Sequence, residues 1–127
     1  MKLLPDTHSF IWWNSAPEFL SKQALALLED EANEPVISVV NIWEIQIKNA
    51  AGKMDLTVPL ENIVKTYSEN GIEILPVYAS HILQLNSLPD HHRDPFDRIL
   101  VAQALVKDMT IISKDAKIKQ YPVTVVW

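Results

Sequence analysis

Four acidic residues of this 127-residue chain are candidates for holding a metal ion: Asp6, Glu44, Asp97 and Asp115. Asp6 directly follows the apolar run KLLP, and Asp115 comes two residues after the run TIIS. If such carboxylates converge, their mutual repulsion raises their pKa values unless cations lie between them, so convergence implies a metal site. With oxygen ligands only, the ion indicated is Mg²⁺ or Mn²⁺.

Three of these acids also have an ordinary structural explanation. Asp6 could end a strand or cap the following helix. Glu44 could be a solvent-facing partner of Lys48, four residues later on the same helix. Asp115 could be a turn aspartate. Taken one at a time, none of them requires a function.

The segment HHRDPFDRILVAQALVKD, residues 91–108, poses the same choice for two aspartates. Asp94 as N-cap, Pro95 at the first helical position and Asp97 in the first turn form an ordinary helix start. The remaining acids gather in surface segments such as EDEANE, residues 29–34. Asp6 and Asp115 each follow a short apolar run that could form a strand, so the four acids could meet at one edge of a sheet. Helix caps at unrelated places would not be expected to meet in this way, so the combination of the four acids favours a site.

The elements that must position these acids alternate along the chain. Short apolar or β-branched runs predict strands at 2–5, 35–40, 72–77, 109–113 and 122–127. Caps, periodic apolar residues and terminal glycines or prolines predict helices at 7–15, 21–32, 41–53, 59–71, 78–89 and 95–107. This order predicts an α/β fold, a three-layer αβα sandwich with a mostly parallel central sheet, in one domain over residues 1–127. In such sheets, ligands bind beyond the carboxyl ends of the strands.

The helix predicted at 41–53 carries one apolar stripe. Trp43, Ile47 and Ala50 share a face, and Gly52 supplies the stop signal. This stripe is the part of the helix that we expect to pack against other elements.

Composition limits the function classes. Hydrophobic residues make up 48% of the chain and only two glycines occur, which is typical of a compact globular protein. The absence of cysteine excludes disulfides, thiolate metal sites and cysteine nucleophiles. The N-terminus has no long apolar run, so we expect a soluble, cytoplasmic protein with no membrane partner. The net charge of −5 argues against a nucleic-acid partner unless bound divalent cations offset the acids.

Several longer segments resemble the PIN-domain ribonucleases, specifically the VapC-like toxins of bacterial toxin–antitoxin pairs. The resemblance runs nearly end to end and is carried by LLPDTHSFIWW, ISVVNIWEIQIK, the glycine–lysine pair at 52–53, LPDHHRDPFDRILVAQA, and TIISKD followed by Tyr121. One departure is Pro5, where an aliphatic residue is usual. No acid of the family pattern is missing.

The resemblance implies a Mg²⁺-dependent endoribonuclease. Asp6, Glu44, Asp97 and Asp115 would hold the metal and form the catalytic set. The products would carry a 5′-phosphate and a 3′-hydroxyl, which fits a metal-activated water as the nucleophile. The implied partners are an RNA substrate, a cognate antitoxin and a second copy of the chain in a homodimer.

Residues beside the four acids could assist. Candidates for orienting a carboxylate or a water are Thr7, Asn41, Asp94 and Ser113, and each has an alternative as a capping or turn residue. Candidates for contacting RNA phosphate are Arg93, Arg98 and Lys48, together with Lys53 and Lys114; for the lysines, charge balance of an acidic rim is the preferred explanation. His8, His91 and His92 could be ligands or proton carriers, but ordinary loop histidines are the preferred explanation. Trp12, Trp13 and Trp43 could stack on bases, but packing in the core or at an interface is preferred.

Two alternatives belong to other functional classes. A response-regulator receiver domain is also a small parallel α/β protein with aspartates and Mg²⁺ at the sheet edge. It would need paired acids after the first strand and an aspartate after the third, and PDT and EILPV supply neither. A catalytically silent PIN-like binding module is the other alternative, and retention of all four acids argues against it.

Overall fold

Five parallel strands form one central sheet in the order β3-β2-β1-β4-β5 in the computed structural model, which describes residues 1–127. The strands are β1 Lys2–Pro5, β2 Glu34–Ser38, β3 Glu73–Leu75, β4 Thr110–Ile112 and β5 Val125–Val126. The first strand is the central one, and it pairs with β2 through Leu3 and Pro35 and with β4 through Pro5 and Ile112. The carboxyl ends of β1, β2 and β4 therefore lie side by side.

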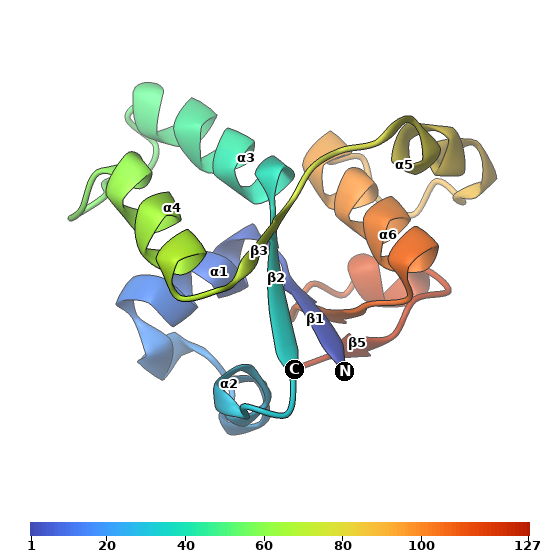
Figure 1. Ribbon diagram of the computed structural model, residues 1–127. Coiled ribbons are helices and arrows are strands. Elements are labelled where there is room, and N and C mark those ends of the chain that lie inside the picture. Colours follow the sequence, from blue (N-terminus) through green and yellow to red (C-terminus); the bar gives the residue numbers. More distant parts are fainter.

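Six α-helices cover the two faces of this sheet. They are α1 Thr7–Ser15, α2 Lys22–Glu29, α3 Val39–Ala50, α4 Leu60–Glu69, α5 Ala79–Gln84 and α6 Pro95–Lys107. Figure 1 shows α1, α2, α3 and α4 on one side of the strands and α5 and α6 on the other. The predicted three-layer αβα sandwich is confirmed, and the sheet is wholly parallel.

Alternation along the strands explains how both faces are filled. Leu4 of β1 and Ile111 of β4 pack with Leu100 of α6 in one core. Their neighbours Leu3 and Ile112 point the opposite way and pack with α2. A sheet that is buried on both faces needs apolar residues at consecutive positions, which is why the strands read as continuous hydrophobic runs.

The start of α3 differs from the prediction. The strand expected at 35–40 ends at Ser38, and the helix begins at Val39. The Ser38 hydroxyl accepts a hydrogen bond from the backbone N–H of Val40, and the Asn41 side chain accepts one from the backbone N–H of Ser38. These two side-chain hydrogen bonds cap the helix two residues earlier than β-branched composition alone indicates.

The apolar stripe of α3 is also not the buried face. Trp43 is 60% exposed and Ile47 is 43% exposed, whereas Glu44 is only 3% exposed. Val40 and Ile45 provide the buried apolar contacts. The prediction failed because the buried side of this helix carries polar side chains where it meets a cavity, so hydrophobicity misidentifies the inward face.

The other boundaries follow the predictions closely. The long helix predicted at 95–107 is α6, with the same limits, and Ser21 caps α2 as expected. The strands predicted at 72–77 and 122–127 are shorter, since Pro76 and Pro122 have no N–H to donate to a ladder. The segment 78–89 contains α5 and a 3₁₀ turn, Leu85–Ser87. The longest helix has 13 residues, and no helix has both the length and the hydrophobicity needed to span a bilayer.

Candidate active site

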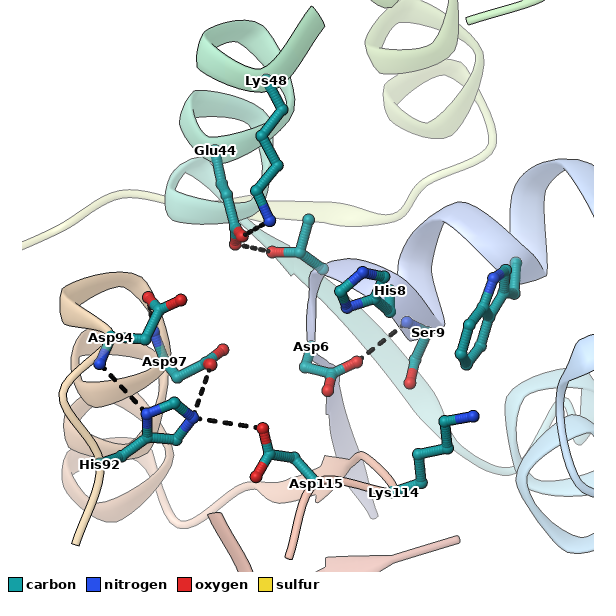
Figure 2. Close-up of a pocket in the computed structure, with 12 residues that line it drawn as sticks. Asp6, His8, Ser9, Glu44, Lys48, His92, Asp94, Asp97, Lys114 and Asp115 are labelled. Atoms are coloured by element: carbon teal, nitrogen blue, oxygen red, sulfur yellow. Dashed lines mark hydrogen bonds and ion pairs between the residues drawn. The ribbon is translucent and has the colours of Figure 1, made fainter. Parts of the chain in front are cut away.

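A cavity of about 400 Å³ opens at the carboxyl edge of the sheet. Five of its lining residues are acids, and they come from four separate parts of the chain. The residues that line it are Asp6, Thr7, His8, Ser9, Trp12, Glu44, Lys48, His92, Asp94, Asp97, Lys114 and Asp115. Figure 2 shows the side chains around it, and we call it the acidic cavity.

Asp6 lies directly after the central strand and is 8% exposed. One carboxylate oxygen accepts the backbone N–H of Ser9 at 2.9 Å, so Asp6 does cap α1. The other oxygen accepts the hydroxyl of Ser113 at 2.6 Å. Ser113 follows β4, the neighbour of β1, and this strand pairing brings together two residues that are far apart in sequence. Capping and orientation toward the cavity are therefore combined in one side chain.

Glu44 enters the cavity from the second turn of α3. Its Oε1 accepts the hydroxyl of Thr7 at 2.6 Å, and its Oε2 lies 2.6 Å from Nζ of Lys48. The Thr7 oxygen in turn accepts the side-chain amide of Asn41 at 3.2 Å. The ordinary pairing of Glu44 with Lys48 is present, but on a buried carboxylate. The hydrogen bond to Glu44 raises the pKa of Lys48, despite the lowering effect of its partial burial.

Asp94 and Asp97 lie at the start of α6. Asp94 is the N-cap, and its Oδ1 accepts the backbone N–H groups of Phe96 and Asp97. Burial raises the pKa of Asp97 to about 8, with further contributions from Asp94, Asp6, Glu44 and Asp115. A carboxylate this unfavourable to ionise is a strong candidate for cation binding.

His92 joins two of the acids. Its Nε2 lies 3.0 Å from Oδ2 of Asp97 and 3.2 Å from Oδ2 of Asp115. Its Nδ1 accepts the backbone N–H of Asp94 at 3.1 Å, so the ring hydrogen is on Nε2 and points to the carboxylates. The two acids and His92 are close enough to form a three-ligand cluster. This tautomer, however, makes His92 a donor that holds the two carboxylates and leaves the carboxylate oxygens as the candidate ligands.

Asp115 begins a turn after β4. Burial alone would raise its pKa, but the backbone N–H of Lys117 and the side chain of His92 outweigh burial and hold the pKa below its usual range. The Lys117 N–H lies 2.7 Å from Oδ1. Oδ2 faces His92, so the expected turn role and a position at the cavity occur together.

The donor set of the acidic cavity suits a divalent cation. Its acids offer oxygen ligands without sulfur, which is the preference of Mg²⁺ and Mn²⁺. Ser9 supplies a second observation, because its side chain is buried and its hydroxyl has no hydrogen-bond partner within the protein. A buried hydroxyl at a polar cavity is placed to bond a water or a ligand oxygen. The residues present therefore fit such an ion.

The structure brings most of the sequence candidates together. Asp6, Glu44, Asp97 and Asp115 line the acidic cavity, with Thr7, Asp94 and Lys48 beside them. Asn41 and Ser113 are fully buried directly behind the acids. Arg93 and Arg98 do not line the cavity, and Arg98 instead donates to the Pro89 carbonyl and the Tyr121 hydroxyl.

Five residues that line the cavity were not among the residues preferred for the site: His8, Ser9, Trp12, His92 and Lys114. His92 was expected to be an ordinary loop histidine, and its position two residues before the helix cap was the available signal. Trp12 was expected to pack, and Lys114 to balance charge, yet both line the acidic cavity. Their signal was proximity in sequence to Asp6 and Asp115, which for Lys114 simple charge pairing also explains.

Known structures share this fold at low sequence identity. A chain of VapBC2 from Rickettsia felis, bound to a DNA fragment from their promoter, matches with a TM-score of 0.73 at 16% identity, over 99% of this chain and 98% of that one. FitAcB from Neisseria gonorrhoeae matches with a TM-score of 0.66 at 16% identity, over 98% of this chain and 96% of that one. A chain of a toxin–antitoxin complex from Klebsiella pneumoniae matches with a TM-score of 0.63 at 16% identity, over 98% of this chain and 96% of that one.

Sequence comparison identifies the family. No curated protein matches the chain. The family model for the PIN domain matches residues 3–123, which is nearly the whole sequence. This match spans β1, the acidic cavity and β4, so it covers every element that contributes an acid. The chain belongs to the PIN domain family.

Proposed function

We propose that this protein is a metal-dependent endoribonuclease and the toxin of a toxin–antitoxin pair, with residues 1–127 acting as one nuclease domain in the cytoplasm. The observation that carries the proposal is the convergence of Asp6, Glu44, Asp97 and Asp115 on one cavity. Caps, turns and the pairing with Lys48 explain each acid singly, but not a shared cavity in which burial, together with repulsion from the other acids, raises the pKa of Asp97.

The four carboxylates would hold Mg²⁺, or Mn²⁺ in its place. Such an ion supplies an activated water and neutralises charge on the phosphate. The protein's own contribution is to fix the ligands: Ser113 orients Asp6, Thr7 orients Glu44, and His92 holds Asp97 and Asp115. Removing a residue that holds a metal ligand in this way typically lowers metal affinity or activity by about 10- to 100-fold.

Positive groups near the acids would receive the RNA backbone. Lys114 lines the cavity and can contact phosphate, whereas Lys48, which also lines it, is paired with Glu44. Arg93 is exposed nearby in the loop before α6 and remains a candidate for a more distant phosphate. Arg98 is bonded to Pro89 and Tyr121, which favours a role in holding the loop that carries His92.

A protein partner and a second copy are part of the proposal. The Klebsiella pneumoniae chain of similar fold comes from a toxin–antitoxin complex. Exposed apolar residues, among them Trp43, Val77 and Ile82, line a separate cavity of about 330 Å³ between α3, α5 and α6. Exposed apolar patches of this kind commonly mark protein interfaces.

A cleavage assay tests the enzymatic part. Purified protein should cut RNA in Mg²⁺ or Mn²⁺, lose activity in EDTA, and regain it when the ion is restored. The products should carry 5′-phosphate and 3′-hydroxyl ends, which end-labelling reactions distinguish. Cleavage that persists in EDTA, or products with a 2′,3′-cyclic phosphate, would contradict the mechanism. Binding of RNA without any cleavage would support the silent binding module.

Expression in bacteria tests the toxin part. Production of the protein should stop growth, and co-expression of its neighbouring antitoxin should restore it. An active-site variant made at the same level is the control and should leave growth unaffected. Active enzyme that does not slow growth would point to a housekeeping nuclease and against a toxin.

A further inference from the structure

The acidic cavity has two chemically different ends. His92, Asp94 and Asp97 lie together on one side of it, and Lys114 lies on the other side of Asp6 and Asp115 (Figure 2). Trp12, the one hydrophobic residue among the twelve that line the cavity, is at the Lys114 end. We call Trp12, His8 and Lys114 the aromatic rim. The acids account for metal binding, but they give no reason for an indole in the same cavity.

The Trp12 ring is held in place from behind. It packs against Phe19 and Trp127, with ring centroids 5.9 and 6.0 Å away. His8, one helical turn earlier, lies 5.7 Å from it. The side chain is partly exposed, so these contacts do not enclose it. A fixed, partly open indole at a cavity wall is the arrangement that stacking on a flat ligand requires.

Lys114 brings an uncompensated positive charge to the same end. Its Nζ lies over the Trp12 ring, 4.8 Å from the ring centre, so this exposed side chain must move off the ring when a base stacks on that face. The side chain forms no ion pair with a carboxylate. Lys48, in contrast, lies 2.6 Å from Glu44 and is neutralised. Lys114 is therefore the lysine of the acidic cavity whose charge remains available to an anion.

Ser9 adds a hydrogen-bond donor between the two ends. It is on α1 with Trp12, its side chain is 1% exposed, and its hydroxyl has no partner. A buried hydroxyl left unbonded is costly unless a ligand or water bonds it. A phosphate or sugar oxygen lying between the acids and the indole would do so.

We propose that the aromatic rim binds one nucleotide of unpaired RNA, with its base against Trp12 and a phosphate beside Lys114, next to the bond cleaved at the acids. This rests on the proposed nuclease function and adds a place where that function would bind a base. A base in a duplex is stacked on both faces and cannot reach the indole, so the rim selects single strands and loops. Because every base has a flat aromatic face, the rim adds little sequence preference.

Binding measurements on variants test this. The probe is a short fluorescent single-stranded oligoribonucleotide, followed by anisotropy in Ca²⁺, and a duplex of the same sequence is the comparison. Trp12→Leu should weaken single-strand binding about tenfold, in the range of aromatic stacking, whereas Trp12→Phe should retain most of it. Lys114→Gln should weaken single-strand binding a few-fold. It should also reduce the dependence of RNA affinity on salt concentration by the amount expected for about one phosphate contact.

Matched controls separate stacking from general effects. Trp43→Leu removes an indole that is 60% exposed and outside the acidic cavity, and Lys119→Gln removes an exposed charge nearby. Both should bind like wild type, and the affinity for Mn²⁺ should be the same in every variant. If Trp12→Leu impairs folding, Trp12→Phe and Lys114→Gln still decide.

Two results would overturn the proposal: equal affinity for single strand and duplex, or a Trp12→Leu affinity no weaker than that of Trp43→Leu. If the wild type cleaves RNA and either result is obtained, only the aromatic rim is wrong. If the wild type neither binds nor cleaves RNA in any divalent cation, the proposed function fails as well.

Discussion

Replacing Asp97 with asparagine is expected to reduce RNA cleavage at least about 100-fold while making the metal-free protein more stable. The loss of activity follows because asparagine keeps the shape of the side chain but removes one negative ligand, an effect at least as large as losing a partner of a ligand. The gain in stability follows because partial burial, and then repulsion from four other acids, disfavours the ionised form of Asp97 in the folded protein, whereas asparagine does not ionise. Few core substitutions would change activity and stability in opposite directions.

The comparison needs two further variants. Asp90→Asn removes a charge from the same loop at a side chain that is 93% exposed, so it should change neither quantity. Asp94→Asn keeps a good helix cap, and near-normal cleavage by it would identify Asp94 as a cap and not a ligand. Initial cleavage rates and thermal melts measure both effects. If Asp97→Asn cleaves RNA at the wild-type rate, Asp97 is not a metal ligand.

The metal-free protein is expected to lose stability as pH rises from 6.5 to 8, by about 2 kcal/mol in total. Burial raises the pKa of Asp97 from 3.8 to about 8, and the side chain is only 17% exposed. Between these values the unfolded chain has released the proton while the folded protein keeps it. The stability from this group is therefore fully present below pH 3.8 and is lost toward pH 8, at no more than about 1.4 kcal/mol per pH unit.

The other groups with a shifted pKa affect the stability of the protein outside this pH range. The pKa of Asp115 is lowered, so its contribution is lost only in acid. Burial lowers the pKa of His81, so its contribution to stability is present above pH 6.5 and is lost as the pH falls. The raised pKa of Lys48 matters only above 10.5. Asp97 is thus the shifted group that acts between pH 6.5 and 8.

Thermal melts at several pH values in EDTA measure the effect. The melting temperature should fall by roughly 5 °C across the window. Mn²⁺ should raise the melting temperature most at the upper end, because a cation replaces the missing proton. Asp97→Asn should remove most of the slope. A flat wild-type profile, or an unchanged slope in Asp97→Asn, would mean that Asp97 ionises normally.

Local sequence signals predicted most of the fold. The limits of α6 follow from a cap, a proline and a periodic helix, which are all local features of residues 94–107. The alternation of strands and helices indicated a parallel sheet, and a parallel sheet brings the residues that follow its strands to one edge. That geometric rule is why Asp6 and Asp115 could be placed near one another without coordinates. It is also why the receiver-domain alternative could be set aside, since β3 is followed by no acid.

The sequence places His92 two residues before the helix cap, but its role also depends on distant contacts that the sequence does not specify. Its backbone N–H donates to the hydroxyl of Tyr121, which also accepts from Arg98. Its ring is aimed by the backbone of Asp94. Only the folded loop specifies these bonds, since Tyr121 is 29 residues away from His92 in the sequence.

The inward face of α3 shows a different limit. A hydrophobic pattern identifies the side of a helix that faces a core, but α3 also borders a cavity. Glu44 and Asn41 are buried because partners satisfy them, whereas Trp43 lies on the surface and touches Phe96 edge-on. Residue type alone cannot distinguish a satisfied buried carboxylate from a solvated one.

The hydrogen bond from Ser113 to Asp6 has a consequence for how the protein is made. It spans 107 positions of the sequence, and the last acid of the cavity, Asp115, is synthesised shortly after Ser113. Translation adds about 5 to 20 residues per second, so an emerging chain spends several seconds with Asp6 and Glu44 already made but without β4 beside β1. A chain broken off before residue 113 lacks the hydroxyl that orients Asp6 and the acid that completes the set. Under the proposed function, incomplete products would therefore lack nuclease activity, and the complete set of acids arises only when β4 has been made and joins the sheet.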